Sequence, residues 1–167
     1  MKQVVVGLGA NLGAGQATLR AAACALREAY PDGFAASPLY RSAPQHCPPG
    51  SPPFWNAVVG FAVPETLAPE VLLDALLALE QEHGRARSVP NAPRTLDLDL
   101  VLFNDECIAS PRLTVPHPRA LNRDFVLGPL AALYPERRWP GGGQTVAALW
   151  DAFAGPRTLE LVAEQWC

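Results

Sequence analysis

Two aspartates two positions apart, Asp97 and Asp99, are the residues of this chain whose spacing is best suited to chemistry. They lie in the segment Leu96–Leu102, where leucines alternate with the aspartates as in a strand that buries one face. On such a strand both carboxylates project from the same face, roughly 6.5–7 Å apart. Mg²⁺ takes oxygen ligands, commonly one or two carboxylates together with substrate phosphates. The spacing predicts either a divalent-metal site or the solvated outer face of an antiparallel strand.

Arginines concentrate around these aspartates although the chain as a whole is acidic. The formal net charge is −3, which argues against a general attraction to nucleic acid or to an anionic membrane. A guanidinium group binds phosphate oxygens through two parallel hydrogen bonds, so clustered arginines predict a local anion site. Between positions 85 and 123 the arginines are Arg85, Arg87, Arg94, Arg112, Arg119 and Arg123.

The segment Phe54-Trp55-Asn56 combines an aromatic ring with an amide at the start of a predicted strand. Alternation places Phe54 and Asn56 on one face and Trp55 on the other. An aromatic ring can stack on a flat heterocycle while the amide pairs with its hydrogen-bonding edge. Strand aromatics are more often part of a core, so this segment alone leaves both interpretations open.

Two further groups also have an ordinary structural explanation. Glu80, Arg85 and Arg87 lie at a predicted helix end and in the loop after it, where surface ion pairs are common. His117 stands between two prolines, which hold the chain stiff and extended. A single loop histidine seldom has a role, but the arginines around this one favour contact with phosphate.

The glycine-rich segment from Gly7 to Gly13 follows a predicted strand and precedes a predicted helix. It does not fit a dinucleotide-binding loop, because Leu12 stands where the third glycine of that motif is required. We interpret the segment as a tight strand-to-helix turn whose backbone approaches some other group.

The elements that must position these residues follow from hydrophobic periodicity and from the positions of glycine and proline. We predict strands over 3–9, 34–40, 54–63 and 95–103 and a short strand near 107–108. We predict helices over 14–29 and from a start within 68–70 through 82, and short helices near 121–133 and 145–153. Residues 111–118 are predicted to be a loop. The order strand–helix–strand–strand–helix–strand with a helical tail is that of a ferredoxin-like α/β sandwich in the α+β class. Its mainly antiparallel sheet would be covered by two helices.

The bulk composition fits one domain spanning residues 1–167. The chain is 49% hydrophobic and 17% charged, enough apolar residues for a core and too few charges for disorder. Its four cysteines lack metal-binding spacing, and no stretch reaches membrane-spanning length. No secretory segment is recognisable, so we expect a reduced cytoplasmic location.

Taken in order, the motifs resemble the 6-hydroxymethyl-7,8-dihydropterin pyrophosphokinase family of folate biosynthesis. The resemblance spans residues 5 to about 130 and is most specific in its last two parts. The matching segments are Gly7-Leu8-Gly9-Ala10-Asn11-Leu12, Tyr40-Arg41-Ser42-Ala43-Pro44, Phe54-Trp55-Asn56-Ala57, Glu80 with Gly84-Arg85-Ala86-Arg87, Pro93-Arg94-Thr95-Leu96-Asp97-Leu98-Asp99, and Leu113-Thr114-Val115-Pro116-His117 with Asn122-Arg123-Asp124-Phe125.

The resemblance implies transfer of pyrophosphate from ATP to the hydroxymethyl group of the reduced pterin, giving AMP and the pterin diphosphate. It implies two Mg²⁺ ions held by Asp97 and Asp99, with Arg85 and Arg94 as further catalytic residues. The pterin would lie between two aromatic rings, and its implied contacts are Ser42, Ala43, Pro44, Phe54, Asn56, Asp97 and Phe125. The implied ATP contacts are Glu80, Arg87, Arg94, Leu100, Arg112, Thr114, His117 and Arg123.

Three functions are compatible with the sequence. The first is an active pyrophosphokinase, and the second is a relative that binds pterin or nucleotide without turnover. The second is suggested by departures from the family pattern, at Asn91-Ala92 in a shortened loop and at Pro118. The third, a ferredoxin-like nucleic-acid module, lacks the expected basic surface and aromatic strand platform. The adjacent carboxylates favour the first, with small-molecule substrates, no nucleic-acid or membrane partner, and a monomeric state.

Overall fold

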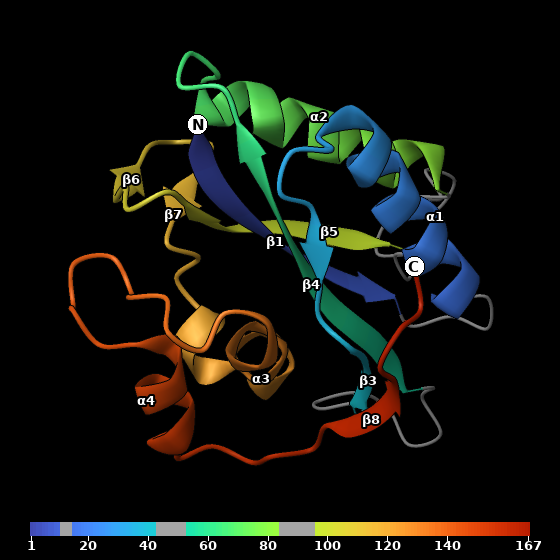
Figure 1. Ribbon diagram of the computed structural model, residues 1–167, viewed down its shortest axis with the longest axis vertical. Helices are drawn as coiled ribbons and strands as arrows, with labels where there is room; N and C mark the ends of the chain where they lie inside the picture. Colours follow the sequence, from blue (N-terminus) through green and yellow to red (C-terminus); the bar gives the residue numbers. More distant parts are fainter. Residues whose placement is uncertain (11–14, 43–52, 84–95) are drawn as a thin grey trace.

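An antiparallel sheet forms the centre of the fold, in the spatial order β5–β1–β4–β3–β8, with β2 also paired to β4 (Figure 1). The computed structural model describes residues 1–10, 15–42, 53–83 and 96–167. The strands of this sheet are β1 (Lys2–Ala10), β2 (Ala35–Ala36), β3 (Leu39–Ser42), β4 (Phe54–Val63), β5 (Asp97–Phe103) and β8 (Glu160–Ala163). A separate hairpin pairs β6 (Ile108–Ala109) with β7 (Thr114–Val115).

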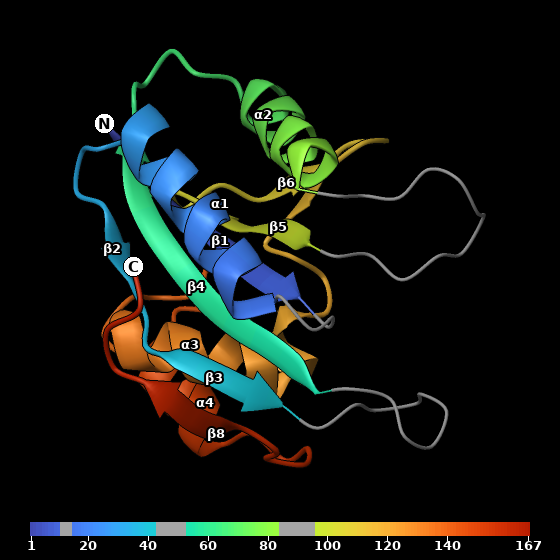
Figure 2. The ribbon, with the colours of Figure 1, turned by 90° about the vertical axis from the view of Figure 1, so that its right-hand side faces the viewer.

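Helices cover both faces of the sheet. They are α1 (Gly15–Ala29), α2 (Pro69–Glu82), α3 (Asp124–Leu133) and α4 (Val146–Asp151), and a 3₁₀ turn (Ala120–Asn122) precedes α3. Figures 1 and 2 show α1 and α2 together on one side of the sheet, and α3 and α4 on the other. No helix within the described ranges is long and apolar enough to cross a membrane.

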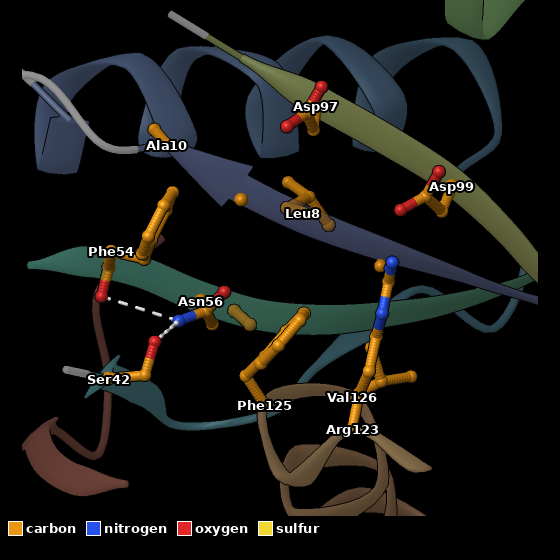
Figure 3. A pocket seen from close by; sticks show the side chains of 13 residues that line it. Leu8, Ala10, Ser42, Phe54, Asn56, Asp97, Asp99, Arg123, Phe125 and Val126 are labelled. Atoms are coloured by element: carbon orange, nitrogen blue, oxygen red, sulfur yellow. Dashed lines mark hydrogen bonds between the residues drawn. The ribbon is translucent and has the colours of Figure 1, made fainter. Parts of the chain in front are cut away.

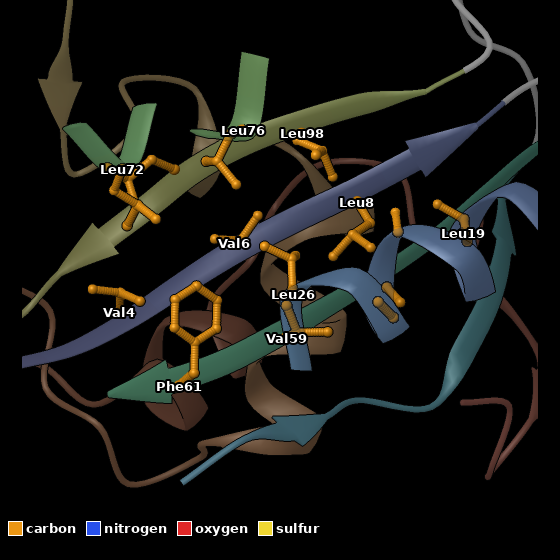
Figure 4. Packing of buried hydrophobic residues seen from close by; sticks show 14 of the residues in the cluster. Val4, Val6, Leu8, Leu19, Leu26, Val59, Phe61, Leu72, Leu76 and Leu98 are labelled. Atoms are coloured by element: carbon orange, nitrogen blue, oxygen red, sulfur yellow. The ribbon is translucent and has the colours of Figure 1, made fainter. Parts of the chain in front are cut away.

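The larger core lies between the sheet and the helices α1 and α2. In α1, Leu19 and Leu26 are fully buried at the helical spacing that the sequence predicts. They pack against alternate residues of the central strands, among them Val6, Val59 and Phe61 (Figure 4). Pro69 is the first residue of α2, where its missing N–H costs no hydrogen bond. These elements confirm the ferredoxin-like α+β arrangement.

The second core corrects the expectation of only two covering helices. Val5, Val58 and Val101 point to the opposite face and pack against α3 residues such as Leu127 and Leu130. The central strands are therefore buried on both faces along part of their length, which explains their nearly continuous apolar runs. At the start of α3, the same face of the sheet is not covered by a helix of the described ranges and borders a cavity.

The strand predicted over 34–40 is instead two short strands, β2 and β3. The break falls at Ser37-Pro38, where proline has no N–H to donate to the ladder. The Ser37 hydroxyl accepts the backbone N–H of Val58 at 2.9 Å, and the Ser37 N–H donates to the Val58 carbonyl at 2.8 Å. These two hydrogen bonds keep the segment between β2 and β3 next to β4.

The predicted helical tail is also wrong in part, because the tail ends in strand β8 at the sheet edge beside β3. Beyond β8, the Trp166 side chain is 94% buried and its indole N–H donates to the Ser37 carbonyl at 2.7 Å. The Trp166 carbonyl in turn accepts from Arg20 of α1 at 2.7 Å. The tail therefore supplies the edge strand beside β3 and is held to the sheet and to α1 through Trp166. Residues 111–118, predicted as a loop, contain the short strand β7.

Candidate active site

A cavity of about 250 Å³ opens on the uncovered part of the sheet, bounded by β5, β1, β4, the end of β3 and the start of α3. Figure 3 shows Asp97 and Asp99 along one side, and Phe54, Asn56 and Phe125 along the other. The lining residues are Gly7, Leu8, Gly9, Ala10, Ser42, Phe54, Asn56, Ala57, Asp97, Asp99, Arg123, Phe125 and Val126.

Strand register explains why these residues meet. In β1, Gly9 pairs with Asp97 of β5 on one side and with Asn56 of β4 on the other. Two positions earlier, Gly7 pairs with Asp99 and with Val58. Residues directly opposite in a sheet share a face, so Asp97, Gly9 and Asn56 form a row across three strands. The glycines leave the middle of that row without side chains.

The two aspartates lie as the alternation predicts. Leu98 and Leu100 are buried beneath β5, while Asp97 and Asp99 are half-exposed on the cavity face. The alternation ends after Leu100 because a bulge shifts the register between β1 and β5 at that point. Both carboxylates therefore face the cavity, on a strand whose other face is packed in the core.

The bulge also positions His117. The Val101 carbonyl accepts the backbone N–H of His117 at 3.0 Å, which holds the histidine loop against β5. His117 Nε2 lies 4.0 Å from Asp99 Oδ1, and His117 Nδ1 accepts the Arg119 backbone N–H at 3.2 Å. Since Nδ1 is an acceptor, the proton of the neutral ring is on Nε2 and faces the cavity carboxylate.

The charge state of His117 is set by opposing influences. Burial lowers the pKa of His117, Asp99 acts to raise it, and Arg123 and Arg119 lower it further. The net direction is downward from the usual histidine value. A neutral His117 offers one N–H donor toward the Asp99 side of the cavity, whereas an anion bound there would favour the protonated form.

The amide of Asn56 has a defined orientation. Its Nδ2 donates to the Ser42 hydroxyl at 2.8 Å and to the Phe54 carbonyl at 3.3 Å, and both Ser42 and Asn56 are buried (Figure 3). Because both amide protons already donate hydrogen bonds, the group that Asn56 presents to the cavity is the acceptor oxygen Oδ1. The position of an added Cβ at Gly9, 3.6 Å from Oδ1, places this oxygen over the β1 backbone. The site therefore suits a ligand with an N–H donor edge.

Two phenylalanines form apolar walls at this end of the cavity. Phe54 at the start of β4 and Phe125 in the first turn of α3 lie on either side of Asn56 in Figure 3. Trp55 points away, as alternation predicts, and packs against Gly15 at the start of α1. The Arg123 guanidinium lies 5.5 Å from the Phe125 ring centroid, and its side chain extends toward Asp99 in Figure 3. Aromatic walls beside a directional acceptor fit a flat heterocycle.

Some predicted ATP contacts lie away from this cavity. Glu80 is buried at the end of α2 and so is not a surface residue, and its carboxylate accepts the backbone N–H of Leu98 at 2.9 Å. Arg112 forms an exposed ion pair with Asp74 of α2, which raises the pKa of the Arg112 guanidinium. Leu100 is buried in β5 and Thr114 is exposed in β7. These four residues come from α2, β5 and the β6–β7 hairpin.

Five of the predicted site residues lie outside the described ranges. These are Ala43, Pro44, Arg85, Arg87 and Arg94.

The sequence analysis missed the cavity role of Gly7 and Gly9. Both are extended residues inside β1, in agreement with the strand predicted over 3–9, and residues 11–14 of the predicted strand-to-helix turn lie outside the described ranges. The available signal was their spacing, since two glycines two positions apart in a strand remove adjacent side chains from one face.

The donor set around Asp97 and Asp99 bears on the kind of metal that would fit. Within the described ranges no group of three or more His, Cys, Asp or Glu side chains could enclose an ion. Mg²⁺ does not need such a cage, because it keeps waters and takes phosphate oxygens alongside one or two carboxylates. Two half-exposed carboxylates facing a cavity fit an ion that arrives with a phosphorylated substrate.

Comparison with known sequences gives consistent matches over most of the chain. A family model described as 7,8-dihydro-6-hydroxymethylpterin-pyrophosphokinase matches residues 5–135. The chain is 45% identical over 144 residues to a 2-amino-4-hydroxy-6-hydroxymethyldihydropteridine pyrophosphokinase of Pseudomonas aeruginosa, covering 85% of this chain and 86% of that protein. It is 40% identical over 146 residues to a protein of the same name from Synechocystis, covering 87% and 73%.

Solved structures match the fold at much lower identity. A crystal structure of wild-type HPPK-DHPS from Plasmodium falciparum superposes with a TM-score of 0.70 at 14% identity. The match covers 91% of this chain and 44% of that chain, so this protein spans less than half the length of the two-part relative. The likeness supports the ferredoxin-like α+β fold.

Proposed function

Because the chain belongs to the 7,8-dihydro-6-hydroxymethylpterin-pyrophosphokinase family, we propose that the cavity between β5 and α3 is where it carries out the family's reaction. The activity is pyrophosphate transfer from ATP to hydroxymethyldihydropterin in folate biosynthesis. The observation that carries the assignment of the site is the row Asp97–Gly9–Asn56. It places a carboxylate two strands away from an amide that can pair with a heterocycle, with only a glycine between them.

In this proposal Phe54 and Phe125 stack on the faces of the pterin, and Asn56 Oδ1 accepts from its N–H edge. Both aromatic residues line the cavity on either side of Asn56. The ring so placed would direct its hydroxymethyl group along the row toward Asp97. Ser42 fixes the amide through its hydroxyl. Ala43 and Pro44, which follow Ser42, are proposed to supply backbone contacts to the same edge.

Asp97 and Asp99 are proposed to bind two Mg²⁺ ions through their cavity-facing oxygens. When bound, such ions neutralise phosphate charge and lower the pKa of an attacking hydroxyl group. Phosphoryl-type transfer needs alignment and charge neutralisation more than a covalent nucleophile. The half-exposed side chains are accessible for this purpose, and the buried leucines of β5 hold them in place.

The triphosphate is proposed to lie on the Asp99 side of the cavity. Arg123 lines the cavity there, and His117 presents Nε2 toward Asp99. Arg85, Arg87 and Arg94 are proposed as further phosphate contacts. Glu80 of α2, Leu100 of β5, Arg112 and Thr114 of β7 are proposed to form the nucleoside end. We propose that the whole chain acts as one domain, as a monomer in the cytoplasm.

The reaction can be tested by following AMP formation from ATP and Mg²⁺ with and without 6-hydroxymethyl-7,8-dihydropterin. We expect AMP and pterin diphosphate in equal amounts, only when the pterin is present, and loss of both products after chelation of Mg²⁺. Folded protein that binds ATP and pterin but forms no AMP would instead support the ligand-binding relative. The paired carboxylates of Asp97 and Asp99 favour an active enzyme over a ligand-binding relative.

Replacing Ser42 by alanine tests the orientation of the Asn56 amide. Loss of one buried hydrogen-bond partner costs about 1 kcal/mol or somewhat more, so we expect pterin affinity to fall roughly 5–10-fold. Ser42→Thr keeps the hydroxyl and serves as the matched control with near-normal affinity. Calorimetric titration with the pterin measures both variants. Equal affinity of Ser42→Ala and the wild type would show that the amide needs no support from Ser42.

A further inference from the structure

Glycines inside the central strands differ in whether the protein itself requires them. In β4, a Cβ added at Gly60 would lie 2.0 Å from the Tyr134 hydroxyl, so packing excludes any side chain there. In β1, the nearest atom of the described residues to an added Cβ is 3.5 Å away at Gly7 and 3.6 Å away at Gly9. These are ordinary contact distances, so the described part of the protein would admit alanine at both β1 positions.

Backbone conformation does not require glycine in β1 either. The positive-φ glycines of the described chain are Gly33, Gly141 and Gly143, so Gly7 and Gly9 have conformations open to other residues. Glycine weakens a strand interior because it adds backbone entropy and no side-chain packing. A strand glycine that neither packing nor φ explains often marks a bulge, a bend, or close approach of a ligand or another backbone. Gly7 and Gly9 pair in regular register with both neighbouring strands, which favours close approach of a ligand.

The position of Gly9 identifies which ligand group approaches. It lies directly between Asp97 and Asn56, and a Cβ on it would stand 3.6 Å from Asn56 Oδ1. That is the space an N–H edge must enter to reach this oxygen. Phe54 and Phe125 border the same space, so a flat ring held between them meets the sheet with its edge.

We propose that Gly9 is a specificity-determining residue, because its missing side chain lets the edge of a bicyclic heterocycle rest on the β1 backbone between Asn56 and Asp97. The inference rests on the proposed function of the cavity. A methyl group at position 9 would lift the ring away from Asn56 Oδ1 and would shift its hydroxymethyl group relative to Asp97. Misplacement by about 1 Å can lower a reaction rate about 10²-fold, so both binding and turnover are affected.

The test is Gly9→Ala, measured by calorimetric titration with 6-hydroxymethyl-7,8-dihydropterin, by AMP formation and by thermal unfolding. We expect the melting temperature to equal or exceed that of the wild type, pterin affinity to fall at least tenfold, and kcat to fall as well. A single-ring 2-amino-4-hydroxypyrimidine can shift within the cavity, so its affinity should fall less than that of the pterin. Pterin affinity within twofold of the wild type overturns the inference, and so does a marked loss of thermal stability.

Two control variants separate the possible outcomes. Gly142→Ala places a methyl group in open, exposed space and should leave pterin affinity and stability unchanged. Gly60→Ala should lower the melting temperature clearly, since packing requires that glycine. A wild-type protein that binds no pterin would refute the proposed function itself. If the wild type binds pterin and Gly9→Ala binds it equally tightly, only the role of Gly9 is refuted.

Discussion

Asp99→Asn is expected to lower pyrophosphate transfer at least about 10²-fold, the loss that follows removal of one contact stabilising the transition state. Asparagine keeps the shape of the side chain but removes the charge that would hold a divalent cation. Asp97→Asn should have a comparable effect, because Asp97 occupies the same face of β5. Steady-state AMP formation across a Mg²⁺ titration measures both variants.

The fold should survive these substitutions. Both side chains are half-exposed and lie outside the two cores, so the melting temperature should change little. Asp105→Asn is the matched control, since Asp105 is exposed in the turn after the same strand and lies outside the cavity. If both cavity variants kept near-normal rates at saturating Mg²⁺, the assignment of the metal site to these carboxylates would be wrong.

Trp166→Ala is expected to destabilise the protein by about 3–5 kcal/mol, the range for truncating a buried large aromatic residue. The indole is 94% buried, so its removal leaves a cavity at the edge of the larger core. It also leaves the buried carbonyl of Ser37 without its indole donor. Urea denaturation followed by fluorescence or circular dichroism gives the free energy of unfolding.

Trp166→Phe separates the contribution of the ring from that of its N–H, and Val162→Ala is a control. Trp166→Phe keeps most of the ring but loses the N–H, so it should cost about 1–3 kcal/mol. Val162→Ala changes an exposed residue of β8 and should remain within about 0.5 kcal/mol of the wild type. A loss below about 1 kcal/mol for Trp166→Ala would mean that the tail does not stabilise the sheet edge through this side chain.

Local pattern predicted most of the fold because strands and helices have short periods. The alternation around Asp97 and Asp99 predicted their shared face, and the spacing of Leu19 and Leu26 predicted the buried face of α1. Strand β8 escaped prediction because a four-residue edge strand is too short for a clear pattern, and its pairing with β3 is a long-range contact. The break at Ser37-Pro38 likewise depends on a hydrogen bond to Val58 in another strand.

By itself the sequence determined the family, the fold class and the residue types of the site, since motifs and periodicity are properties of the chain order. Tertiary structure alone decided which of those residues meet. Cross-strand register places Gly9 between Asp97 and Asn56, although nothing near Gly9 in the sequence indicates either neighbour. Tertiary packing also pairs Arg112 with Asp74 and turns the Asn56 amide toward Ser42. The reason is physical: register and side-chain orientation depend on contacts between distant segments, which no local pattern encodes.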